Sequence, residues 1–189
     1  MAAPTGIFYE IAMDATTASL DSDTERLAYT GDGEVNDGGS NDLSFGSVNI
    51  AAGAANSALN AMLWRVSAWN SNTSITNFRF WVTENFTEAA SKMKWVHCML
   101  DATSEWVPSA TISSYSAAPN SGWADMDESE PSANIVGADG SATTITAAAD
   151  DTLEAMVMYA AIAASEVLGT YTGTATDYDL QFSLKFDYS

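Results

Sequence analysis

An acidic stretch flanked by glycines offers the clearest arrangement of metal ligands in the sequence. Residues 32–38 read Asp-Gly-Glu-Val-Asn-Asp-Gly, with side-chain oxygens at Asp32, Glu34, Asn36 and Asp37. Calcium prefers oxygen ligands, and alternating acidic residues followed by glycine are typical of a tight calcium loop. The EF-hand spacing is not met, because its sixth position here holds Asp37 and its twelfth holds Leu43. We therefore favour a solvated acidic loop, and calcium binding by these four residues is the alternative.

The only histidine and the only cysteine are neighbours, His97 and Cys98. They lie in a predicted strand, where adjacent side chains point to opposite faces, so the two cannot easily share one metal ion. The sequence contains no Cys-x-x-Cys, no His-Glu-x-x-His and no Gly-x-Ser-x-Gly elbow. We interpret His97 as structural and assign no catalytic residue and no cofactor. With one cysteine, no disulfide can form within the chain.

Six tryptophans could include a platform for stacking sugars. The simpler interpretation is that they fill the core or a subunit interface. Trp64 alternates with Met62 and Val66, which predicts a core position. Trp81 lies on the opposite face of its predicted strand from the neighbouring phenylalanines, and Trp123 lies in an acidic loop. We expect Trp81 and Trp123 at contacts with a partner.

The elements that position these residues are strands. From Tyr178 to Tyr188 every second residue is apolar, a period of two that indicates a strand with one buried face. Phe182, Leu184 and Phe186 should be core residues. Alternation near the start of the chain predicts a second strand, with its apolar face formed by Ile7, Tyr9, Ile11 and Met13.

Two strong apolar blocks, 59–69 and 75–82, are separated by the turn-forming residues 70–74. They predict a long hairpin, with Phe78, Phe80 and Val82 on one face of its second strand and Ile75 and Trp81 on the other. Further strands are expected at 94–100, 111–115 and 142–146.

The segment 153–164 is rich in helix formers. The all-β context and the flanking turn residues nevertheless favour a strand buried on both faces.

Long acidic loops are predicted at 14–41 and 117–140, and the acids of 125–128 are interpreted as solvated. The fold class is all-β. One domain, residues 1–189, should form a two-sheet β-sandwich of about eight or nine strands, jelly-roll or immunoglobulin-like.

The charge balance excludes several functions. Six basic residues against 25 acidic ones give a formal net charge of −19. Phosphate backbones and anionic lipid surfaces repel such a chain, so nucleic acid and membrane are not expected partners. No signal peptide and no apolar segment long enough to span a membrane is expected, which is consistent with synthesis in a cytoplasm.

The same charge predicts that salt stabilises the protein. Self-repulsion should weaken the folded state at low ionic strength, where the screening length grows to ~30 Å at about 0.01 M salt. The melting temperature should therefore rise as NaCl is added, which calorimetry can measure. A melting temperature that stays flat from low to molar salt would contradict this expectation.

Two segments resemble known virion modules. Arg65–Val82 resembles a hairpin of β-sandwich proteins in tailed-phage and related virus particles, and Gly169–Thr174 resembles the last hairpin of many immunoglobulin-like surface and virion modules. The two segments cover about a fifth of the chain. The resemblance implies an assembly role without catalysis, and it transfers no functional residue.

We therefore expect a virus-particle structural protein, most simply a capsid decoration or cement subunit made in the host cytoplasm and located in the virion. Its partners would be the major capsid protein or other virion proteins, together with copies of itself in a closed cyclic oligomer such as a trimer. A carbohydrate-binding module on a tail or surface structure is the alternative. A glycan hydrolase using paired carboxylates comes third.

Overall fold

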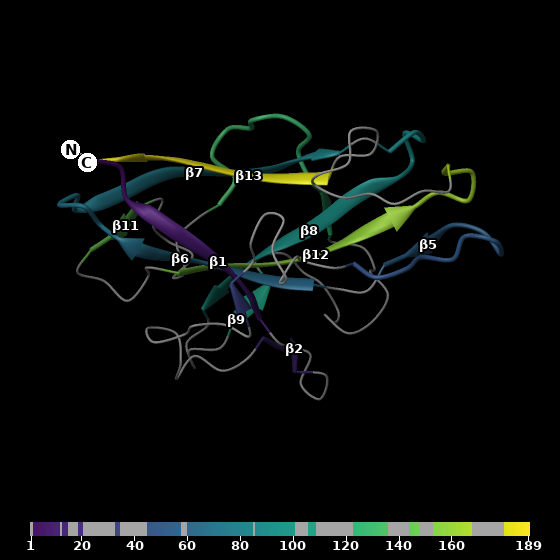
Figure 1. Ribbon diagram of the computed structural model, residues 1–189, viewed down its shortest axis with the longest axis horizontal. Coiled ribbons are helices and arrows are strands. Elements are labelled where there is room, and N and C mark those ends of the chain that lie inside the picture. Colours follow the sequence, from purple (N-terminus) through teal and green to yellow (C-terminus); the bar gives the residue numbers. More distant parts are fainter. Residues whose placement is uncertain are drawn as a thin grey trace.

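The computed structural model describes residues 2–11, 13–14, 19–20, 33–34, 45–57, 60–84, 86–100, 106–108, 123–135, 144–147, 153–167 and 180–189. None of these residues is helical, and every strand pair that they form is antiparallel (Figure 1). The chain is all-β, as its alternating sequence pattern predicts.

Within the described residues, eight strands have three or more residues: β1 (Thr5–Ile11), β6 (Asn60–Ala68), β7 (Ser74–Glu84), β8 (Lys92–Leu100), β9 (Trp106–Pro108), β11 (Thr144–Thr146), β12 (Leu153–Ile162) and β13 (Leu180–Tyr188). Five have two residues: β2 (Met13–Asp14), β3 (Ser19–Leu20), β4 (Gly33–Glu34), β5 (Ala55–Asn56) and β10 (Ala124–Asp125).

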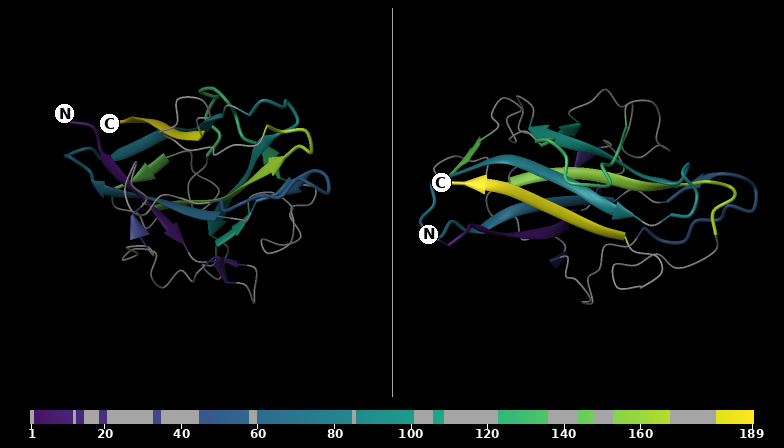
Figure 2. Two further views of the ribbon diagram at one scale, coloured as in Figure 1. Left: turned by 45° about the vertical axis from the view of Figure 1, so that its right-hand side comes forward. Right: turned by 90° about the horizontal axis from the view of Figure 1, so that it is seen from above.

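The strands form one large sheet, one small sheet and a separate pair. The large sheet has the order β10-β8-β12-β6-β1-β4, with β5 added beside β12 and β9 beside β8. The small sheet has the order β11-β7-β13, and β2 pairs with β3. Seen from above, β7 and β13 run side by side along the molecule, and both chain ends lie at the same end of it (Figure 2).

One hydrophobic cluster joins the large sheet to the small one. Its buried members include Met62, Trp64 and Val66 of β6, Met93 and Trp95 of β8, Met156 and Met158 of β12, and Ile75, Phe78, Phe80 and Val82 of β7. Aromatic rings meet across the two sheets: the centroids of Trp64 and Phe78 are 5.0 Å apart, and those of Phe80 and Trp95 are 5.7 Å apart. The apolar faces read from the sequence in β6 and β7 therefore pack against each other.

The predicted hairpin of 59–69 and 75–82 is wrong in its pairing. Both strands exist, but β6 pairs with β1 and β12, whereas β7 pairs with β11 and β13. Between them the chain passes through Asn70 and Ser71, whose φ angles are 51° and 68°, and crosses from one sheet to the other. Each strand has one largely apolar face. Burying these two faces against each other removes both from water, which hydrogen-bonded pairing of the two strands would not do.

The predicted face of Ile75 is also wrong, because β7 contains a bulge. Arg79 pairs with Lys185, yet Thr76 pairs with Asp187, so β7 has one extra residue at this point. Asn77 adopts a φ of 54° there. A bulge resets the alternation of side chains, and Ile75 consequently joins the same buried cluster as Phe78 instead of facing outward with Trp81.

The other strand predictions are largely confirmed. Residues 153–162 form the strand β12, and Met156 to Ala160 are all buried, so this strand is covered on both faces. The last strand exists as β13, and Phe182, Leu184 and Phe186 pack on the cluster while remaining half-buried. The expected strands at 94–100 and 142–146 appear as β8 and β11. Residues 111–115 and Tyr178 lie outside the described part of the chain.

Strand β1 turns the unexpected side towards the core. Its apolar alternation runs through Ile7, but Phe8 is the residue that packs on the cluster, with its ring 6.4 Å from that of Phe80. Gly6 lies on the same face as Phe8, two residues away, and the indole of Trp64 occupies the space that a β-carbon at Gly6 would need. A glycine at this position is what allows β1 to pair closely beside the largest side chain of β6.

Candidate functional site

The outer face of the small sheet presents polar side chains around one tryptophan. On β7, Arg79 and Trp81 point away from the face that buries Phe80, because side chains alternate along a strand. Trp81 lies beside Ser183 and Arg79 beside Lys185 on β13. Trp81 is half-buried, as is the neighbouring Ser183. Its placement opposite the core face agrees with the sequence analysis, and its role at a contact remains a prediction.

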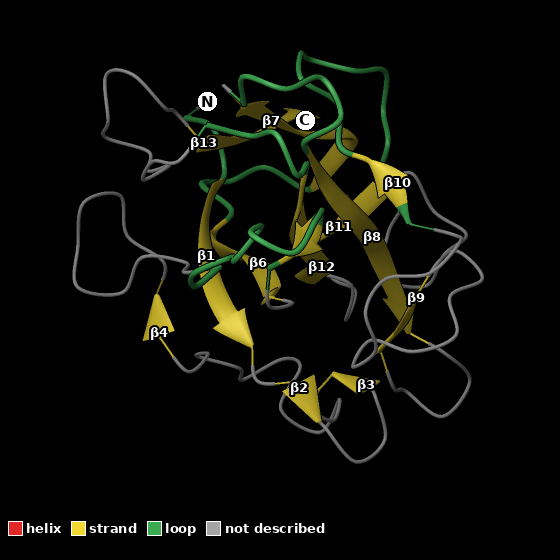
Figure 3. Ribbon diagram, turned by 90° about the vertical axis from the view of Figure 1, so that its right-hand side faces the viewer, coloured by secondary structure: helices red, strands yellow, loops and turns green. Residues whose placement is uncertain are grey.

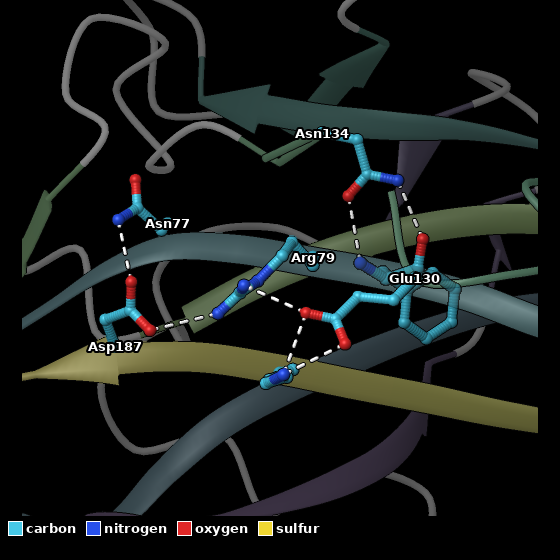
Figure 4. A network of polar contacts seen from close by, with 7 residues as sticks. Asn77, Arg79, Glu130, Asn134 and Asp187 are labelled. Atoms are coloured by element: carbon cyan, nitrogen blue, oxygen red, sulfur yellow. Dashed lines mark hydrogen bonds and ion pairs between the residues drawn. The ribbon is translucent and has the colours of Figure 1, made fainter. Parts of the chain in front are cut away.

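Arg79 organises a charge network on this face (Figure 4). One of its terminal nitrogens lies 2.9 Å from Oε1 of Glu130, and the other lies 3.0 Å from Oδ1 of Asp187. Lys185 donates to both carboxylate oxygens of Glu130, at 2.8 and 2.9 Å, and Asn77 donates to Oδ2 of Asp187 at 2.8 Å. The Arg79 side chain is only 18 % exposed, so the two carboxylates compensate a largely buried positive charge.

The network lowers the pKa of both Glu130 and Asp187. The hydrogen bond from Lys185 and the charges of Lys185 and Arg79 hold the pKa of Glu130 below its usual value. The hydrogen bond from Asn77, together with Arg79, does the same for the pKa of Asp187. A carboxylate with a lowered pKa stabilises the folded state above its unfolded pKa, and this stabilisation is lost as the pH falls through the folded pKa. The network therefore weakens in acid.

The predicted acidic loop is held in ion pairs where the structure describes it. Asp125 pairs with Lys94 and Glu128 pairs with Lys92, both on β8. Together with Glu130, these acids bind four of the six basic residues in the chain: Arg79, Lys92, Lys94 and Lys185. The acids of 125–128 are therefore not simply solvated, as their sequence suggests. Their basic partners are distant in sequence and meet the acids only after the sheets form, so no local pattern indicates the pairs.

Trp123 is buried within the fold. It is 8 % exposed and packs edge-on against Tyr159, with the ring centroids 5.2 Å apart. Burial, with a smaller effect from the charge of Asp125, raises the pKa of Tyr159 to about 12. A ring this well covered leaves little surface for a partner, so Trp81 is the stronger of the two interface candidates. Trp64 is in the core, as predicted.

His97 and Cys98 are both buried in β8, with 5 % and 0 % of their surfaces exposed. As neighbours in a strand they point to opposite faces, and across the pairing with β12 His97 lies beside Met156 and Cys98 beside Ala155. Burial lowers the pKa of His97 to about 4, so its imidazole is neutral at physiological pH. A buried, neutral imidazole on a sheet face supports the structural interpretation of His97.

Glu166, which no sequence motif marks, is a buried carboxylate with 5 % of its surface exposed. Its Oε1 accepts hydrogen bonds from the backbone N–H of Thr87 at 2.8 Å and from the Thr87 hydroxyl at 2.6 Å. Its Oε2 accepts one from the N–H of Glu88 at 3.2 Å. These bonds tie the turn after β7 to the turn after β12. The sequence carries no local signal for them, because the partners are 78 and 79 residues apart.

The calcium prediction lies almost wholly outside the described residues. Of the four proposed ligands only Glu34 is described, as part of β4 paired with β1. Among the described residues, no group of three or more His, Cys, Asp or Glu side chains is placed to hold a metal ion. Within the same residues, no helix is long and apolar enough to cross a membrane.

Comparisons of the chain with protein-family models, with curated proteins and with solved structures found no match.

Proposed function

We propose that this chain is a structural protein of a virus particle, a capsid decoration subunit that adheres through the outer face of the small sheet. The observation that carries the proposal is Trp81, a half-buried aromatic ring on a sheet face that is otherwise polar. Aromatic anchors surrounded by polar groups are the usual centres of protein interfaces. Repeated over many copies, a modest contact of this kind would hold a shell together by avidity.

Among the described residues, three buried side chains of types often used in catalysis support a role without catalysis. His97 and Cys98 are buried on opposite faces of β8, and the Glu166 carboxylate accepts backbone and hydroxyl hydrogen bonds. Each is accounted for by packing or by hydrogen bonding within the chain.

As the finer architecture we propose a two-sheet β-sandwich, jelly-roll or immunoglobulin-like, comprising the whole chain as one domain. In its support, the large and small sheets share one hydrophobic cluster, and the ring of Trp64 on β6 packs edge-on against Phe78 of β7 and tilted against Phe186 of β13. Packing of two sheets across a common core is the defining feature of a sandwich.

The same tryptophan favours carbohydrate binding as the second candidate function. The accessible part of a half-buried indole beside polar groups suits a sugar ring, because the ring stacks on the indole and its hydroxyls bind the polar neighbours. Ser183, which pairs across the sheet with Trp81, supplies a hydroxyl, and the Arg79 network lies two positions along β7.

The proposal predicts that Trp81→Ala disrupts assembly without unfolding the protein. Sedimentation velocity should show the wild-type chain as a closed oligomer and the variant shifted towards the monomer by at least about tenfold in dissociation constant, as expected for an interface anchor. Tyr188→Ala is the matched control, because Tyr188 is an exposed aromatic, 44 % accessible, at the end of the same sheet. A wild-type monomer that binds a glycan through Trp81 would favour the carbohydrate-binding alternative instead.

A further inference from the structure

Residues Trp123–Ile135, here called the strap, connect the edge of the large sheet to the edge of the small one. The strap begins as β10, which pairs with β8 through Ala124 and Asp125 (Figure 3). The N–H of Met126 then donates to the carbonyl of Met93 on β8, and the carbonyl of Asp127 accepts from the N–H of Val82 on β7. Two successive residues of the strap thus bind two different sheets.

Further along, the strap replaces a neighbouring strand for β7. Beyond its pairing with β11 at residues 74–76, one edge of β7 contacts the strap. The side-chain amide of Asn134 accepts from the N–H of Phe80 at 2.9 Å and donates to the carbonyl of Phe80 at 2.7 Å. The N–H of Asn134 donates to the carbonyl of Phe78 at 3.1 Å. Asn134 therefore pairs with this edge as a peptide group of an adjacent strand would.

The forces that hold the strap are of two kinds. Trp123, Met126 and Ile135 anchor it by burial, with 8, 2 and 3 % of their surfaces exposed. Between these anchors, Asp125, Glu128 and Glu130 form the ion pairs described above. Ion pairs between partly exposed groups are screened by salt, whereas apolar burial is not. High salt or acid should therefore loosen the centre of the strap first.

We propose that the strap is an electrostatically latched segment, and that an opened strap is replaced on β7 and β8 by the strap of a second copy of this chain. Two features of the surface that an opened strap leaves on β7 and β8 favour binding of a second strap. Opening takes the strap carboxylates away from four basic side chains in a chain of net charge −19, so an acidic segment fits the site by charge. It also exposes the unpaired edge of β7, and an extended segment fits that edge. A second strap satisfies both and repeats every contact, which is the condition for exchange of segments between copies.

Zero-length carbodiimide cross-linking tests this exchange, because it joins an amine to a carboxylate that are in direct contact. The Lys185–Glu130 pair is such a contact, with an N–O distance of 2.8 Å. Isotope-labelled and unlabelled full-length chains are mixed, held in about 1 M NaCl, where the screening length is only ~3 Å, returned to low salt and cross-linked. Mixed-mass Lys185–Glu130 products should rise towards the statistical share, while samples kept in low salt should give products of pure mass.

A pair of variants separates the latch from a general loss of stability. Glu130→Gln removes the strap carboxylate that pairs with Arg79 and Lys185. The exchange of straps should then become several-fold faster, as followed through the Lys94–Asp125 cross-link. Glu88→Gln makes the same change of charge outside the strap and should exchange as the wild type does. Hydrogen exchange of the Phe80 and Val82 amides, compared with Val157 in the centre of the large sheet, reports local opening independently of the melting temperature.

Two results would overturn the inference. The latch is refuted if the Phe80 and Val82 amides remain as protected in high salt as in low salt. The exchange is refuted if these amides open but every cross-link keeps its pure mass at high protein concentration. Because the measurement needs only the purified chain, its failure is distinct from a failure of the capsid proposal.

Discussion

Phe80→Ala is expected to lower the free energy of unfolding by about 3–5 kcal/mol, the usual cost of removing a fully buried phenylalanine. Phe80 is 0 % exposed and contacts rings from three other strands: Phe8, Trp95 and Phe182. Removing its ring leaves a cavity between the two sheets that neither sheet can close alone. Denaturant unfolding of both proteins measures the difference.

Phe182→Ala is the matched comparison. Phe182 stacks on Phe80 with its ring tilted by only 2° and its centroid 5.9 Å away, but it is half-buried. Its removal should therefore cost clearly less, although the sequence pattern alone would rank the two residues alike. Equal losses, or a loss at Phe80 below about 1 kcal/mol, would show that the sheets do not share the core described here.

Acidification should destabilise the protein through His97, by roughly 3 kcal/mol between neutral pH and about pH 4. Burial lowers the pKa of this imidazole from 6.5 to about 4. The unfolded chain binds a proton as the pH falls below 6.5, while the folded chain does not. The stabilisation that neutral His97 contributes is therefore complete above pH 6.5, the pKa of the unfolded chain. It is lost progressively as the pH falls to about 4, the pKa in the folded chain.

The His97→Met variant isolates this contribution, because methionine is apolar and similar in length and does not titrate. Below neutral pH, the unfolding free energy of the variant should fall less steeply than that of the wild type. The remaining slope belongs to carboxylates such as Glu130 and Asp187, whose pKa values are also lowered. Parallel pH profiles for the two proteins would mean that His97 is accessible to protons in the folded state.

The strands were predictable because their signal is local. Alternation over Leu180–Tyr188 identifies β13, and the apolar run of β12 identifies a strand that is buried on both faces. The partners of each strand were not predictable in this way. The sequence between β6 and β7 looks like a hairpin turn, but the chain crosses there to the other sheet, because the faces of Trp64 and Phe78 bury each other.

The candidate site was predictable only in part, for the same reason. The position of Trp81 opposite Phe80 follows from alternation along one strand. By contrast, the network around Arg79 joins residues 51 and 108 positions away, and the bulge at Asn77 resets the faces of the strand. A composition of 25 acidic and six basic residues indicates excess negative charge. It does not reveal that four of the basic residues form ion pairs with the strap.

Cosedimentation with virus particles lacking this subunit tests the central claim, adhesion to a capsid through the outer face of the small sheet. The particles are those of the virus that encodes the chain. The account predicts saturable binding of the wild-type protein, a loss of at least about tenfold in affinity for Trp81→Ala, and wild-type binding for His97→Met. A strictly monomeric protein without affinity for the particles, but with clear affinity for a glycan, would contradict the account and establish the carbohydrate-binding alternative.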